Sequence, residues 1–177
     1  MLWVDLEMTG LDDQKDCILE VAAVITDYQL TPIEEFHRII FQPTEVLENM
    51  NDWCKKHHGA SGLTAAVPSG TPLSQAETEL LALINLRFGP KAEKIVLAGN
   101  SIGNDRRFID RYMGHLAVRL HYRMVDVSSF KEVFRERYGV EFKKQDKHRA
   151  VDDVYASIHE LKHYLSFVSM PGKAPST

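Results

Sequence analysis

The stretch Leu2-Trp3-Val4-Asp5-Leu6-Glu7 is an apolar segment that carries two acids, and its apolar residues predict a buried β-strand. Side chains two residues apart on a strand point to the same face, so Asp5 and Glu7 are expected to lie together. Two carboxylates on one face of a core strand repel each other and lose hydration, and such a pair normally needs a cation. The alternative is a strand end with two solvated acids.

Around this strand, the apolar pattern predicts a meander of strands followed by alternating helices and strands. The predicted strands are 2–7, 18–26, 33–41, 94–98 and 123–127. The predicted helices are 51–58, 74–88, 101–113, 128–138 and a last one from Val151. The apolar residues of the last helix keep a spacing of three and four, which is typical of one face packed on a core. This order predicts an α/β fold with a mixed five-stranded sheet flanked by helices.

Two of the predicted helices have local start signals. Thr71-Pro72 followed by Ser74-x-x-Glu77 forms the pattern of a capping box and is expected to open the second helix. Ser128 is the predicted cap of the fourth helix.

The length and composition are those of one globular domain. The chain has 177 residues, of which 44% are hydrophobic and 26% are charged. We expect a single domain over residues 1–168 and a flexible tail at 169–177, which is rich in Pro, Gly and Ser. The longest apolar runs, 21–25 and 80–84, are too short to cross a membrane.

The charge and the N-terminus limit the expected partners and location. A net charge of −4 argues against a protein that follows a long nucleic acid, because such proteins usually present a basic stripe. The N-terminus has no secretory signal, and two cysteines without a disulfide framework fit a reducing compartment. We therefore expect a cytoplasmic protein, or a mitochondrial one if a presequence has been removed.

Further acids follow the later strands. Asp105 ends the segment Gly99-Asn100-Ser101-Ile102-Gly103-Asn104-Asp105, directly after a predicted strand, where open α/β sheets place their sites. Asp152 and Asp153 open the last helix. The helix dipole favours negative charge in a first turn, which is an alternative explanation for Asp105 and for one of this pair. If the acids converge, oxygen-only ligation suits Mg²⁺ or Mn²⁺, and pairs of such ions catalyse phosphodiester cleavage.

Three motifs carry a resemblance to a known family. They are residues 4–11 (Val-Asp-Leu-Glu-Met-Thr-Gly-Leu), residues 99–105 and residues 148–153 (His-Arg-Ala-Val-Asp-Asp). They resemble the three exonuclease motifs of the DEDD superfamily, and a histidine five residues before the last aspartate marks its DEDDh branch. Within that branch the chain resembles the oligoribonuclease family over nearly all of residues 2–168, with supporting blocks at 51–53, 58–63 and 121–128.

The resemblance implies an RNase H-like fold, a homodimer and removal of nucleotides from the 3′ end of short single-stranded RNA, dinucleotides above all. It implies two divalent cations, Mg²⁺ or Mn²⁺, and assigns the last ligand to Asp153 rather than Asp152. The implied metal ligands are Asp5, Glu7, Asp105 and Asp153. His148 is implied as the general base, a role that suits a histidine at neutral pH.

The same resemblance implies how short RNA is selected. The implied substrate-binding residues are Leu11, Trp53, His58, Ser101, Tyr122, Arg123 and Ser128. Leu11 and Trp53 would wedge or stack against bases, and the two serines with Arg123 would cap the 5′ phosphate, while Tyr122 would come from the partner subunit. From the residues alone, the alternatives are core packing for the apolar and aromatic side chains, a helix cap for Ser128 and a solvated strand position for Arg123.

Other interpretations remain open from the sequence. A DEDDh exonuclease that acts on longer RNA or DNA 3′ ends would show a rate independent of chain length. A non-catalytic RNA-binding module is disfavoured, because repelling acids are costly in a phosphate binder. A dimeric scaffold protein would bind no Mn²⁺. Zinc held by Cys54, His57 and His58 has only three candidate ligands and no second cluster.

Overall fold

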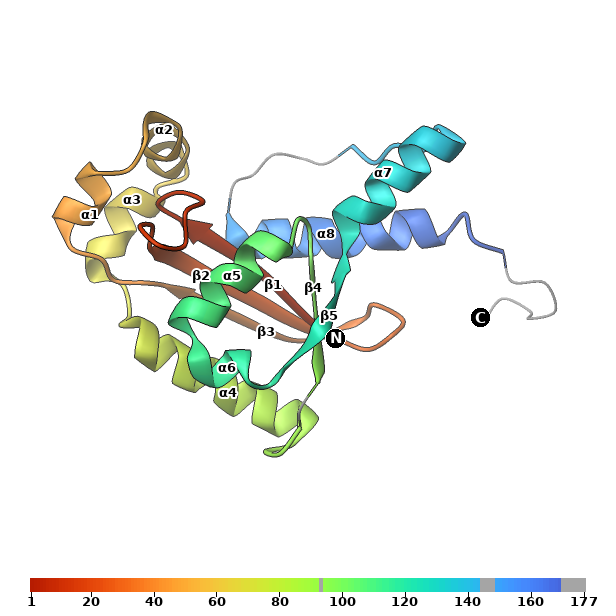
Figure 1. Cartoon of the computed structure of the whole chain (residues 1–177), viewed down its shortest axis with the longest axis horizontal. Coiled ribbons are helices and arrows are strands. Elements are labelled where there is room, and N and C mark those ends of the chain that lie inside the picture. Colours follow the sequence, from red (N-terminus) through yellow and green to blue (C-terminus); the bar gives the residue numbers. More distant parts are fainter. Residues whose placement is uncertain (93, 144–148, 170–177) are drawn as a thin grey trace.

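The structure, a computed structural model, describes residues 1–92, 94–143 and 149–169. Its centre is a five-stranded sheet in the order β3-β2-β1-β4-β5 (Figure 1). The strands are β1 (Leu2–Met8), β2 (Ile18–Thr26), β3 (Pro32–Ile39), β4 (Ile95–Gly99) and β5 (Leu120–Asp126). β1, β2 and β3 pair antiparallel, whereas β4 and β5 run parallel to β1. The predicted α/β fold with a mixed five-stranded sheet is confirmed.

Helices cover both faces of this sheet. They are α1 (Thr44–Glu48), α2 (Asp52–Ala60), α3 (Leu63–Ala66), α4 (Leu73–Phe88), α5 (Gly103–Tyr112), α6 (Gly114–Ala117), α7 (Val127–Tyr138) and α8 (Ala150–Leu165), with one 3-10 turn, η1 (Val67–Ser69). Each predicted helix has a counterpart. The short α1, α3, η1 and α6 are missing from the prediction because three to five residues show no full period of apolar spacing. None of the described helices is long and apolar enough to cross a membrane.

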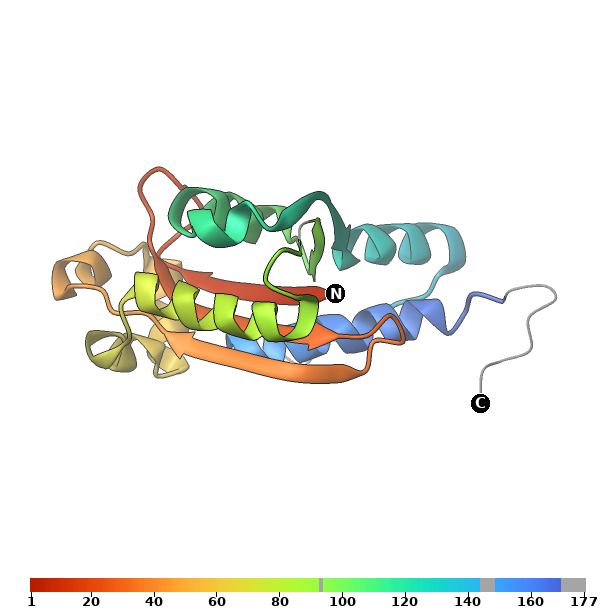
Figure 2. The same cartoon turned by 90° about the horizontal axis from the view of Figure 1, so that it is seen from below.

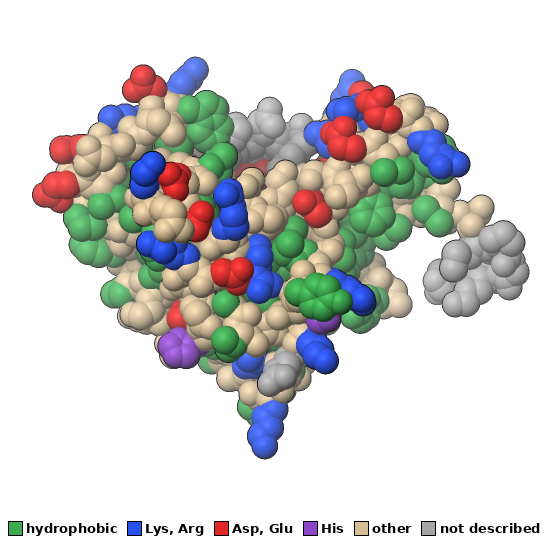
Figure 3. All heavy atoms as spheres, viewed as in Figure 1, with side chains coloured by type: hydrophobic (Ala, Val, Ile, Leu, Met, Phe, Trp, Pro, Cys, Tyr) green, Lys and Arg blue, Asp and Glu red, His purple; other side chains and the backbone are tan. Residues whose placement is uncertain are grey.

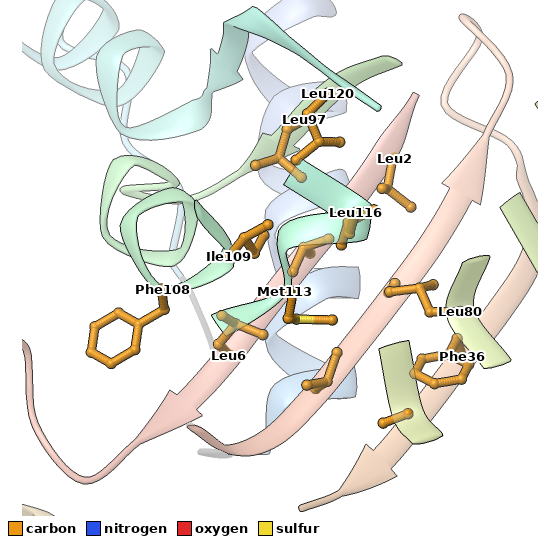
Figure 4. Close-up of a cluster of buried hydrophobic side chains, with 14 of the residues drawn as sticks. Leu2, Leu6, Phe36, Leu80, Leu97, Phe108, Ile109, Met113, Leu116 and Leu120 are labelled. Atoms are coloured by element: carbon orange, nitrogen blue, oxygen red, sulfur yellow. The ribbon is translucent and has the colours of Figure 1, made fainter. Parts of the chain in front are cut away.

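Alternation along β1 sends its side chains to two separate layers. Leu2 and Leu6 join the core formed with α4, α5 and α6 (Figure 4). Trp3 points to the opposite face and joins the core formed with α7 and α8. Figure 2 shows α8 along one side of the sheet and α5 and α6 along the other. Because Asp5 and Glu7 share the face of Trp3, they point toward the α8 layer.

Two predicted helix caps are wrong, because other groups take their place. α4 begins one residue before Ser74 without a side-chain cap, and Glu77 turns toward α6, where it accepts a hydrogen bond from the Leu116 amide at 2.9 Å. α7 is capped by Asp126, which accepts from the Ser128 amide at 3.0 Å. Asp126 ends β5 directly before the helix, so Ser128 falls inside the first turn.

The expected domain boundary at residue 168 stays a prediction. Residues 170–177 of the predicted tail lie outside the described ranges.

Candidate active site

Three of the predicted metal ligands come together where β1 meets the start of α8. Asp5 and Glu7 project from β1, and Asp153 lies in the first turn of α8. One carboxylate oxygen from each lies within 4.8 Å of the other two, and all three side chains are half-buried. Like charges at this separation disfavour one another unless a cation compensates them. The all-oxygen donor set therefore fits a hard divalent cation such as Mg²⁺ or Mn²⁺.

Asp105 stands apart from this group and reaches β1 from the other helix layer. Its side chain is only 6% exposed, and its Oδ1 accepts a hydrogen bond from the Leu6 amide at 2.9 Å. β4 pairs with β1 only at Leu2 and Trp3, so the Leu6 amide lies beyond that pairing and Asp105 supplies its acceptor. Burial raises the pKa of Asp105 to about 7, and the nearby charge of Asp126 adds to this effect.

The raised pKa of Asp105 has a consequence for stability in the absence of metal. The folded state keeps a proton that the unfolded chain releases at lower pH, so Asp105 lowers stability as pH rises toward its folded pKa, about 7. In EDTA we expect the Tm advantage of Asp105→Asn over the wild type to be larger near about pH 8 than near about pH 5. Calorimetric melting at both pH values measures this difference. A constant gap between the two proteins would contradict the assignment.

The predicted general base, His148, lies outside the described residues. The described chain resumes at Arg149, the residue before α8. His148 therefore stays a prediction from its spacing to Asp153.

A pocket of about 460 Å³ opens beside the carboxylate group. Its lining consists of Leu6, Glu7, Met8, Gly10, Leu11, Asn51, Trp53, Cys54 and His58. Trp53 is 59% exposed and Leu11 is 62% exposed, so core packing, the alternative for both, is wrong. The Trp53 ring lies against the His57 ring, with 4.1 Å between centroids. Exposed apolar side chains at the rim of a pocket that contains Glu7 suit a flat, partly apolar ligand.

His58 ties α2 to the end of β1 beneath this pocket. Its side chain is buried, and Nε2 donates to the Met8 carbonyl at 2.9 Å. Nδ1 lies 3.9 Å from Glu7 Oε2. Among the residues that the structure describes, the only group of three that could hold a metal is Asp5, Glu7 and Asp153, so the zinc alternative at Cys54, His57 and His58 gains no support.

Asp126, for which the sequence predicted no role of its own, organises the two predicted cap serines. Its Oδ1 accepts from the Ser101 amide at 3.0 Å, from the Ser128 amide at 3.0 Å and from the Ser128 hydroxyl at 2.6 Å. Ser101 has a left-handed backbone with φ 52°, and Asp126 holds it there. Its position at a strand end before a helix was the available signal.

Gly99, at the end of β4, allows the close approach of β4 to β1. A Cβ on Gly99 would come within 2.8 Å of the Val4 carbonyl, so only glycine lets the two strands approach there.

Tyr122 and Arg123 lie on β5, an outer strand of the sheet. Tyr122 is 74% exposed, so the core-packing alternative is wrong. The Tyr122 ring stacks on the His121 ring at 4.4 Å, and the Arg123 guanidinium lies 5.2 Å from its centroid. Neither side chain is among those that line the pocket of Trp53. Of the residues predicted to bind substrate, Leu11, Trp53 and His58 thus line a pocket beside α2, whereas Tyr122, Arg123 and Ser128 lie on β5 and α7, outside that pocket.

Comparisons with known proteins agree on one family. The chain matches the RNase T family model, described as "Exonuclease", over residues 2–161. It is 48% identical over 170 residues to "Oligoribonuclease, mitochondrial" of Homo sapiens, covering 93% of this chain and 71% of that protein. It is 46% identical over 170 residues to "Oligoribonuclease" of Marinobacter nauticus, covering 93% of each chain.

Solved structures support the fold. E. coli exonuclease I in complex with an oligonucleotide has a TM-score of 0.64 and 17% identity, covering 93% of this chain and 40% of that one. Exonuclease I from Methylocaldum szegediense has a TM-score of 0.61 and 20% identity, covering 93% and 39%. The fold is thus the RNase H-like exonuclease fold, as the sequence resemblance implies. The family model covers most of the chain, and the relative from Marinobacter nauticus is matched over 93% of its length. The chain therefore belongs to the oligoribonuclease family of exonucleases.

Proposed function

We propose that this chain is a metal-dependent 3′→5′ exoribonuclease that hydrolyses short oligoribonucleotides, dinucleotides above all, to nucleoside 5′-monophosphates. One observation carries the proposal: Glu7 belongs both to the three-carboxylate group and to the lining of the pocket of Trp53. A scissile phosphate at the carboxylates would therefore leave its base beside an exposed aromatic ring. The names of the relatives support the same substrate class.

The proposed reaction uses the acids and His148 in distinct roles. Two divalent cations, Mg²⁺ or Mn²⁺, would neutralise the charge that develops on the phosphate. Asp5, Glu7 and Asp153 would hold one of them, and Asp5 would hold the other, with Asp105 acting on that ion directly or through water. His148 would take a proton from the water that attacks phosphorus, while the bond from phosphorus to the leaving 3′ oxygen breaks and that oxygen gains a proton.

The preference for short RNA would come from a closed 5′ end. Ser101, Ser128 and Arg123 would cap the 5′ phosphate, since a guanidinium fork matches phosphate oxygens, and Tyr122 would be contributed by the partner subunit of a homodimer. Figure 3 shows acidic and basic side chains interspersed over the face that carries α5 and α6, which offers no single basic track there for a long backbone. The net charge of −4 agrees with a small substrate.

Removal of the Trp53 ring should weaken substrate binding without unfolding the protein. Base stacking on an aromatic ring contributes about 1–3 kcal/mol, so we expect Trp53→Ala to raise KM for a dinucleotide by about 5- to 150-fold. Trp53 is 59% exposed, so Tm should change little. The matched control is Tyr28→Ala, which removes an aromatic ring of 78% exposure between β2 and β3 and should leave KM unchanged. An unchanged KM in the Trp53 variant would remove the stacking role.

The activity itself is tested with 5′-phosphorylated, labelled RNAs of two, three, five, seven and twenty nucleotides. Initial rates are read with Mg²⁺, with Mn²⁺ and with EDTA. Metal-dependent release of single nucleotides, fastest on the dinucleotide, is the expected result. Equal rates at every length would keep the carboxylate site and exclude the 5′ cap, which leaves a general exonuclease. Absence of cleavage with either metal would overturn the proposed activity in favour of a binding module.

A further inference from the structure

We propose that Glu20 is a positioning residue for the carboxylate site: from β2 it fixes the start of α8, and thereby sets Asp153 against Asp5 and Glu7. The proposal rests on the function proposed above. Glu20 is not among the described residues that could hold the metal, and in the sequence it is simply one residue of an apolar strand.

The Glu20 carboxylate is fully buried and is bonded both to β3 and to the start of α8. Its exposure is 0%, and Oε1 accepts from Arg149 Nη2 at 2.9 Å and Nε at 3.2 Å. His37 Nε2 on β3 lies 2.6 Å from the same oxygen, and Oε2 accepts from the Ala150 amide at 3.3 Å. A buried carboxylate is costly unless its oxygens are bonded in this way. Three of these four bonds come from Arg149 and Ala150, so the stability that Glu20 contributes depends largely on where α8 begins.

These bonds replace the cap that α8 lacks in its own sequence. The residue before the helix is Arg149, whose side chain makes no cap bond, and the first helical residue is Ala150. The Ala150 amide would otherwise be an unpaired donor at the helix start. Glu20 supplies its acceptor from a residue 130 positions away. The start of α8 is thus bonded to the sheet through Glu20.

The sheet register carries this restraint to the metal ligands. Glu20 pairs with Glu7 across β1 and β2, so both side chains lie on the face that α8 covers. At the other end, the Asp153 amide donates to the Arg149 carbonyl at 3.0 Å, which closes the first turn of α8. A short path of bonds therefore runs from Glu20 through Arg149 to Asp153. His148 precedes Arg149 directly in the sequence.

The charge state of Glu20 agrees with this geometry. Burial raises the pKa of Glu20, but the bonds from His37 and Arg149 outweigh this, and the pKa is held below its usual range. Glu20 is consequently ionised at neutral pH, where its attraction to Arg149 is complete. As a fully buried ionised group, it acts on the reaction through the placement of α8.

Glu77 provides a matched control for a purely structural carboxylate. It is 7% exposed, accepts from the Leu116 amide at 2.9 Å and faces His115 Nδ1 at 3.4 Å. It joins α4 to α6, on the sheet face opposite to α8. Loss of either carboxylate removes a buried acceptor for one backbone amide and one histidine. Only the loss of Glu20 should disturb the carboxylate site.

The test compares Glu20→Ala and Glu20→Gln with Glu77→Ala, all below their melting temperatures. Mn²⁺ affinity is measured by calorimetry on RNA-free protein, and kcat and KM are measured separately on a dinucleotide. A displacement of about 1 Å in a catalytic group costs about 10²-fold, so we expect Glu20→Ala to lower kcat by about 10- to 100-fold with a smaller change in KM. Mn²⁺ affinity should fall in the same variant. Glu20→Gln, which keeps an acceptor oxygen, should be intermediate in both, and Glu77→Ala should retain both values.

Two outcomes would overturn the proposal. One is wild-type Mn²⁺ affinity and kcat in folded Glu20→Ala, or in Glu20→Gln where the alanine variant does not fold. The other is an equal loss in Glu77→Ala. If the wild type cleaves no oligoribonucleotide, the proposed function fails, and the Mn²⁺ affinities of the same variants still decide the role of Glu20.

Discussion

Replacing Asp153 with Asn is expected to lower kcat for dinucleotide hydrolysis by on the order of 10³-fold or more, because the change removes one charged ligand from the carboxylate group. The asparagine side chain has nearly the same shape, and the bond from the Asp153 amide to the Arg149 carbonyl is unaffected. A first-turn acid stabilises a helix by only about 0.3–1 kcal/mol, so the fold should survive. The large effect on activity would therefore reflect metal binding rather than unfolding.

The same variant should respond to metal in a characteristic way. Without metal, Asp153→Asn removes one of three carboxylates within 4.8 Å of one another, and the relief of repulsion should offset the lost helix-dipole term. With Mn²⁺, the wild type should gain Tm because binding to the folded state stabilises it, and the variant should gain much less. Melting curves in EDTA and in Mn²⁺ measure both effects.

The control for this prediction is the neighbouring acid. Asp152 is exposed and lies outside the group formed by Asp5, Glu7 and Asp153. Asp152→Asn removes the same charge from the same helix turn, so its activity and its Mn²⁺ response should stay close to those of the wild type. If Asp152→Asn were inactive and Asp153→Asn active, the assignment of the ligand would be reversed.

The fold was predictable where the chain repeats a pattern over many residues. β2 is predicted at its observed bounds, because its residues are apolar apart from Glu20 and Thr26. The apolar residues of α8 keep helical spacing, and this pattern predicted the helix start to within one residue of Ala150. The failure of the Ser74 and Glu77 capping box on α4 was not predictable, because Glu77 bonds to the Leu116 amide, which only the tertiary structure brings near. The cap of α7 did have a local signal, because Asp126 lies directly before the helix and bonds to the Ser128 amide.

The site was predictable by motif and not by local physics. Taken singly, Asp105 and Asp153 each fit a helix N-terminus, and only the family pattern selected them together. Two features had no local signal at all. The bond from the Leu6 amide to Asp105 spans 99 positions, and that from Arg149 to Glu20 spans 129. A buried glutamate inside an apolar strand shows its role only when the residues that bind it are known.

Replacing His148 with Asn should lower kcat by about 10²- to 10⁴-fold, the usual contribution of a general base. Mn²⁺ affinity should be retained, because the carboxylates that would bind the ion are unchanged, and this separates the variant from Asp153→Asn. An ordinary imidazole titrates at about pH 6.5, and only its neutral form accepts a proton. The kcat of the wild type should therefore rise with pH through this region, and the variant should lose that rise.

The matched control for His148 is His159→Asn, which changes an exposed histidine on α8 itself. It should keep both the rate and its pH dependence, since it lies more than one helical turn beyond Asp153. Loss of Mn²⁺ binding in His148→Asn would instead make His148 a ligand or a support for the ligands. A retained pH profile with a small loss of rate would assign the proton to another acceptor. Because Glu20 fixes Arg149, the residue next to His148, the Glu20 variants should reduce the amplitude of this pH-dependent rise in kcat, whereas Glu77→Ala should leave it intact.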